Sequence, residues 1–172
     1  MKSAWTAFWA WYERHYTLNV SIAALLFVLQ LVHLYWLGAD VIAQRLVDES
    51  YWDPSAVLQW AIFFVDYTEI PVLVSVSLVY VNELRKGARA KPLLMLLLLN
   101  SQWLHIFWIT DEFVVSRFSG EAAASSMPAL LAWAAILIDY LELPVIYDTL
   151  KRMVTALRER RLGDALTALR DE

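Results

Sequence analysis

Carboxylate and imidazole side chains interrupt the long apolar stretches of this sequence, and they do so twice. The residues concerned are His33, Asp66, Glu69, His105, Asp139 and Glu142. Asp and Glu stand three residues apart in each pair, so each pair shares one face of a helix. Sets of carboxylate oxygens with a few imidazole nitrogens suit iron, manganese or zinc. The chemistry that these residue types indicate is therefore the binding of metal ions.

Electrostatics favours the same interpretation. A carboxylate at the centre of a membrane costs roughly 2.5–3.5 kcal/mol on insertion scales, and carboxylates at close range also repel one another. No Lys or Arg lies within the apolar stretches at this depth. Two divalent ions would balance four carboxylates, and two neutral imidazoles would complete the ligands. We therefore predict two divalent transition metals, either iron, manganese or zinc.

The polar residues recur in register, which predicts an internal duplication. His105 follows His33 by 72 residues, and Asp139 follows Asp66 by 73 residues, so the two offsets differ by a single position. The segments compared are Gln30–Trp36 with Gln102–Trp108, and Trp60–Val72 with Trp133–Val145. Because acidic residues and histidines are rare in hydrocarbon, their matched positions are a poor fit to chance.

Further repeated residues are expected to support the ligands or to add to them. They are Gln30, Gln102, Asp40, Glu112, Tyr67 and Tyr140. Each Gln lies one turn before a His and could orient its ring or bind a water. Pro71 and Pro144 leave the carbonyls of Tyr67 and Tyr140 without their usual helical partners. Asp40 and Glu112 are either extra ligands or helix-end residues that pair with arginines.

Composition points to a membrane as the solvent of these helices. Hydrophobic residues make up 60% of the chain, above the 45–50% usual for soluble domains. Four apolar runs, at 18–42, 56–83, 91–116 and 126–150, each reach the ~20 residues needed to cross the hydrocarbon. We predict an all-α integral membrane protein, an antiparallel bundle of four transmembrane helices. Two tandem two-helix repeats, 18–83 and 84–150, would be related by a pseudo-twofold axis along the membrane normal.

The positions of Lys and Arg predict the orientation. They cluster before the first run, between the second and third, and after the fourth, so both termini should be cytoplasmic, in a bacterial-type inner membrane. We predict that residues 1–17 form an aromatic interfacial segment and that residues 151–172 form a charged, amphipathic cytoplasmic tail. The chain has no Cys, which excludes thiolate metal sites and disulfides.

The ligand inventory resembles that of the ferritin-like di-iron and di-manganese carboxylate proteins, although their Glu-x-x-His motif is absent and Asp-x-x-Glu stands in its place. This resemblance covers the site pattern alone. It implies a metal-dependent oxidoreductase acting on a lipid, a quinol or another apolar molecule. The expected partners are the bilayer and such a small molecule, and no nucleic acid.

Three other functions stay open. His33 and His105 could be the two axial ligands of a haem b, which would make the protein an electron carrier. Buried acids and histidines could instead form the path of a metal or proton transporter. Glu69-Ile-Pro71 followed by Arg85-Lys86-Gly87 looks like the EXPERA group of four-helix sterol isomerases and receptors, which would imply a binding site for sterol-like lipids.

Overall fold

The computed structural model describes residues 4–52, 54–110 and 129–168, and within them every regular element is a helix. In chain order the elements are α1 (Ala4–Arg14), α2 (Tyr16–Trp36), the π-helix η1 (Leu37–Ile42), α3 (Ala43–Val47), α4 (Ala56–Tyr67), α5 (Glu69–Arg85), α6 (Ala90–Asn100), α7 (Gln102–Ile109), α9 (Ala129–Tyr140) and α10 (Leu143–Ala168). The prediction of an all-α protein is confirmed for these residues.

Two helical stretches are long and apolar enough to cross a membrane. They run from Tyr16 to Val47 and from Leu130 to Arg160. Neither contains a Lys or Arg before its final part, and both expose Leu and Val side chains over much of their length. By length and composition these two helices are candidate spans.

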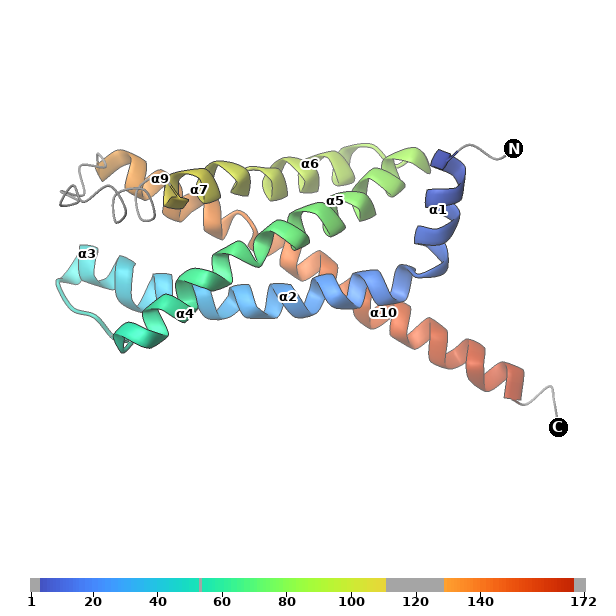
Figure 1. Cartoon of the computed structure of the whole chain (residues 1–172), viewed down its shortest axis with the longest axis horizontal. Coiled ribbons are helices and arrows are strands. Elements are labelled where there is room, and N and C mark those ends of the chain that lie inside the picture. The colour runs from blue at the N-terminus through green and yellow to red at the C-terminus, as the bar shows by residue number, and fades with distance from the viewer. Residues whose placement is uncertain (1–3, 53, 111–128, 169–172) are drawn as a thin grey trace.

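The long helices run side by side, so that segments far apart in the sequence become neighbours (Figure 1). Helix α2 packs against α5 and α10, α5 packs against α6, and α7 packs against α9. The loop between α5 and α6, helix α1 and the far part of α10 lie at one end of the molecule (Figure 1). Helix α3 and the starts of α4 and α9 lie at the opposite end, as an antiparallel arrangement requires.

Apolar side chains fill the space between α2, α5 and α10. Phe27 of α2, Val76 of α5 and Val145 of α10 are fully buried members of this core. At the end that carries the termini, Trp9 and Tyr12 of α1 are buried against Val79 of α5. The core holds α2 close to the second half of the chain, and this closeness brings His33 toward residues that are distant in the sequence.

Proline breaks two of the long helices, at the positions where the sequence leads us to expect it. Helix α4 ends at Tyr67 and α9 ends at Tyr140, each four residues before a proline. Proline has no N–H, so the carbonyl four residues earlier loses its helical donor. Thr68 lies between α4 and α5, and residues 141 and 142 form the turn between α9 and α10. Both Asp-x-x-Glu segments therefore lie at interruptions of regular helix.

Candidate metal centre

Three helices contribute one ligand-type side chain each to a buried cluster. His33 lies near the end of α2, His105 lies in the middle of α7, and Asp139 is the penultimate residue of α9. All three residues are at most 5% exposed. These helices belong to parts of the sequence that are far apart, so the cluster is a product of tertiary packing.

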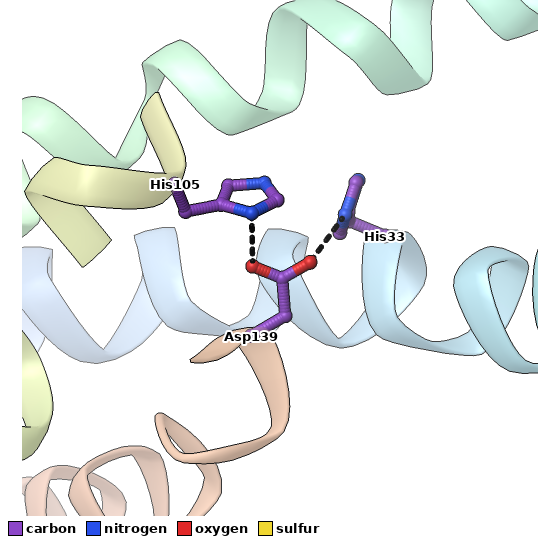
Figure 2. Close-up of side chains that lie close together, drawn as sticks. All are labelled: His33, His105 and Asp139. Atoms are coloured by element: carbon purple, nitrogen blue, oxygen red, sulfur yellow. Dashed lines mark ion pairs between the residues drawn. The ribbon is translucent and has the colours of Figure 1, made fainter. Parts of the chain in front are cut away.

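Asp139 lies between the two histidines and directs one carboxylate oxygen at each (Figure 2). Its Oδ1 is 3.0 Å from Nδ1 of His105, and its Oδ2 is 3.6 Å from Nε2 of His33. The two imidazole rings are nearly perpendicular, with centroids 6.5 Å apart. The histidines thus offer different ring nitrogens to the same carboxylate.

The spacing of these atoms suits a bound metal ion. One nitrogen or oxygen from each of the three side chains lies within 4.8 Å of the others. Ligands about 2.1 Å from a tetrahedral ion are about 3.4 Å from one another. The two nitrogen–oxygen pairs, at 3.0 and 3.6 Å, lie on either side of that value. Among the described residues, this buried cluster could therefore hold a metal ion.

The three remaining predicted ligands are Glu69, Glu142 and Asp66. Glu69 and Glu142 are almost fully buried, at 3% and 1% exposure, but their oxygens are outside the 4.8 Å group. Glu69 is the first residue of α5, and Glu142 lies in the turn before α10. Asp66 belongs to α4, but its side chain lies outside the described part of the structure. Their role as ligands stays a prediction.

The residues expected near the outer end of the helices are less informative. Asp40 lies in the π-helical turn η1 and is half-buried, outside the three-residue cluster. Glu112, its counterpart in the second half of the sequence, lies outside the described residues. Short π-helical turns are frequent at functional sites, and η1 begins four residues after His33.

Gln30 and Gln102 contact a backbone partner that sequence reasoning did not anticipate. Gln30 Nε2 donates to the carbonyl of Val65 at 3.0 Å, and Gln102 Nε2 donates to the carbonyl of Ile138 at 3.1 Å. The two acceptors are the residues immediately before Asp66 and Asp139. Each amide therefore joins the helix of a histidine to the helix of an aspartate, at matched positions in the two halves.

Tyr67 and Tyr140 also form matched contacts, but these join the two halves to each other. Tyr140 donates its hydroxyl to the carbonyl of Leu34, beside His33, at 3.1 Å. The Tyr67 hydroxyl is 2.9 Å from Oγ1 of Thr110, which in turn donates to the carbonyl of Ile106, beside His105. Thr110 escaped the sequence analysis because its counterpart in the first repeat is Gly38, a residue with no polar group to match.

No family model matches this chain, and no match was found among the curated proteins or the solved structures with which it was compared. The function is therefore argued from the cluster and its surroundings.

Proposed function

We propose that this protein is a membrane-embedded metal-binding protein whose centre is held by His33, His105 and Asp139. The single observation that carries the proposal is the burial of an aspartate between two histidines at ligand-like distances. A carboxylate in a low-dielectric interior requires a compensating positive charge. The apolar runs that carry these helices contain no Lys or Arg near the cluster, so a bound cation is the natural source.

A second ion is supported by the way in which Asp139 uses its two oxygens. Each oxygen faces a different histidine, so the carboxylate could hold one ion beside each histidine and bridge the two. Bridged metal pairs are typically about 3.5–4 Å apart. Glu69 and Glu142 are two further buried carboxylates, one at the break between α4 and α5 and one at the break between α9 and α10. A second divalent ion would balance their negative charges. We therefore propose two divalent ions, with iron, manganese and zinc as the candidate elements.

The proposed setting is a bundle of four membrane-spanning helices formed by a duplicated two-helix unit. The two candidate spans supply the first and last crossings. The pairs α4–α5 and α6–α7 supply the second and third, each interrupted by a break near the level of the site. The matched glutamine and tyrosine hydrogen bonds support the duplication, because apolar composition alone would not place polar contacts in register.

The position of Asp139 favours metal ions over a haem held by the two histidines. Axial histidines coordinate the iron from opposite faces of the porphyrin, so the ring must pass between their ligating nitrogens. Here the Asp139 carboxylate lies between the two histidines, in contact with Nδ1 of His105 and Nε2 of His33 (Figure 2). Oxidation or reduction of an apolar substrate stays a prediction from the ligand inventory, and so does transport of a metal.

Elemental analysis of the detergent-purified chain tests the proposal. We expect about two equivalents of transition metal in the wild type and almost none in the double variant His33→Ala/His105→Ala. His15→Ala is the matched control, because this third histidine sits between α1 and α2 and contacts the carbonyl of Trp11, away from the cluster. It should retain the wild-type metal content.

Each other result has a definite meaning. One equivalent that is lost in the double variant would contradict the bridged pair and leave a single-ion site. Wild-type protein without transition metal, even after incubation with Fe²⁺, Mn²⁺ or Zn²⁺, would overturn the metal centre. A stoichiometric Soret absorption band would replace it with a haem site.

A further inference from the structure

The two neighbours of Asp139 in the chain are each tied to the helix of a different histidine. On one side, the carbonyl of Ile138 accepts from Gln102, which begins the helix that carries His105. On the other side, the hydroxyl of Tyr140 donates to the carbonyl of Leu34, the residue next to His33. We propose that Gln102 and Tyr140 are positioning residues that hold the Asp139 carboxylate between the two histidines. This inference rests on the proposed metal centre.

The backbone around Asp139 is where such support is needed. Helix α9 ends one residue later, and Pro144 cannot donate to the carbonyl of Tyr140. A residue at the end of a helix is held by fewer backbone hydrogen bonds than one in its interior. A metal ligand must nevertheless be held within about 0.5 Å of its productive position. The two tethers, from α2 and α7, add to the short-range backbone hydrogen bonds that end α9, such as the one from the Glu142 N–H to the carbonyl of Asp139 at 3.1 Å.

Gly38 indicates how specific the tyrosine tether is. A Cβ atom built on Gly38 would lie 2.9 Å from the Tyr140 hydroxyl oxygen, closer than real Cβ contacts. Any side chain at this position would therefore press on the hydroxyl that reaches the Leu34 carbonyl. In the other half the equivalent residue is Thr110, and its hydroxyl takes a bridging place between Tyr67 and a carbonyl. The tyrosine hydroxyl thus reaches a backbone carbonyl beside a histidine directly where the residue is Gly38, and through a second hydroxyl where it is Thr110.

The side chain of Gln102 is buried as completely as the site itself. Gln102 is 0% exposed, and its amide crosses from α7 to α9 within the protein interior. A buried amide that loses its acceptor is costly, so the pair resists separation of the two helices. Together the tethers fix Asp139 relative to both histidines rather than to one.

Binding of Co²⁺ to the full-length, detergent-purified chain tests this role, because the absorption of bound Co²⁺ reports the coordination geometry. We expect Tyr140→Phe and Gln102→Leu each to weaken Co²⁺ binding by about 10- to 100-fold, as loss of a supporting partner does at other metal sites. At saturating Co²⁺ the d–d absorption bands should also change in position and intensity. A merely structural role would lower stability and leave the bands of the bound ion as they are.

Two matched controls separate the tethers from general effects of the substitutions. Tyr147→Phe removes the hydroxyl of an exposed tyrosine of α10, and Gln44→Leu replaces an exposed glutamine of α3. Both variants should bind Co²⁺ with wild-type affinity and spectrum.

Gly38→Ala provides an independent test should Tyr140→Phe fold poorly. In the wild-type background the added methyl group should displace the hydroxyl and weaken Co²⁺ binding about as much as Tyr140→Phe. In the Tyr140→Phe background it should cause little further loss, because the clashing oxygen is already gone. Losses that simply add would contradict the proposed tether.

The two proposals fail in distinguishable ways. If the wild type binds Co²⁺ and His33→Ala/His105→Ala does not, but Tyr140→Phe and Gln102→Leu keep the wild-type affinity and bands, the positioning role is wrong and the metal centre stands. If the wild type itself binds no Co²⁺, Fe²⁺, Mn²⁺ or Zn²⁺, the metal centre is wrong and the positioning role is overturned with it.

Discussion

Asp139 and Asp148 are both buried on consecutive helices, yet they are surrounded by opposite kinds of partner. Asp148 contacts the ammonium of Lys91 at 2.5 Å, the guanidinium of Arg152 at 2.6 Å and the hydroxyl of Tyr80 at 3.0 Å. Among the described residues, the ion-pair partners of Asp139 are two histidines, which carry positive charge only when protonated. Within the described part of the chain, Lys and Arg neutralise the Asp148 carboxylate but not the Asp139 carboxylate.

The network around Asp148 is balanced within itself. Arg152 contacts Glu83 at 2.5 Å in addition to Asp148. In the order Lys91, Asp148, Arg152, Glu83, two bases therefore alternate with two acids. More than half of the Lys91 side chain is exposed, which reduces the cost of bringing its charge to the site. The comparison indicates that the described part of the chain uses Lys and Arg to neutralise acids near one end of the bundle and omits them at the His–Asp cluster. A bound metal ion would supply the positive charge that Lys and Arg do not supply at this cluster.

The largest expected effect comes from removing charge at the two aspartates in turn. Asp139→Asn should lower metal affinity by at least about 100-fold, because it removes a direct ligand and its charge. Asp148→Asn, the matched control, should leave metal content unchanged. Competition titration against a chelator of known affinity measures both. Equal metal content in Asp139→Asn and in the wild type would erase the difference between the two sites.

The loss of folding stability caused by Asp148→Asn should be an effect of intermediate size. Asp148→Asn leaves Arg152 and Lys91 without their shared carboxylate, and breaking a buried pair typically costs about 3–5 kcal/mol. Because Lys91 is largely exposed, we expect about 2–3 kcal/mol, measured by denaturant unfolding in detergent micelles. Asp148→Leu/Arg152→Met, which removes both charges of the buried Asp148–Arg152 pair and leaves the more exposed Lys91 and Glu83, should restore part of the loss. A stability equal to that of the wild type would mean that the network is incidental.

The smallest effect is expected at an exposed pair outside the candidate spans. Lys86 contacts Glu13 at 3.0 Å, and this hydrogen bond and charge hold the pKa of Glu13 below its usual value. A depressed pKa adds stability that is fully present above the ordinary carboxyl pKa, about 4.3, and is lost as pH falls through the depressed value.

The Lys86 and Glu13 side chains are both about half or more exposed, so solvent screens the pair. Glu13→Gln should therefore shift the unfolding midpoint at pH 7 only slightly, and less still in high salt. A shift comparable to that of Asp148→Asn would contradict the distinction between buried and exposed pairs.

Sequence patterns predicted much of the secondary structure. The long apolar runs at 18–42 and 126–150 correspond to the two candidate spans, and the prolines predicted the breaks after Tyr67 and Tyr140. These features depend on local chemistry, either the solvent preference of a run of side chains or the missing N–H of proline. They are encoded within a few turns of helix, so they can be read without knowledge of the fold. The four-span bundle and its pseudo-twofold axis are predictions that require neighbours beyond that range.

The sequence by itself determined which residue types occur in the apolar segments and that they recur in the same order in both halves of the chain. Tertiary structure alone decided that Asp139 lies between His33 and His105, with one oxygen facing each, and that Gln102 and Tyr140 tie its neighbours to the two histidine helices. The physical reason is that periodicity fixes the face of a helix on which a side chain lies, whereas the approach of α2, α7 and α9 depends on packing among residues distant in the chain. That packing brings a carboxylate and two imidazoles within the reach of one ion.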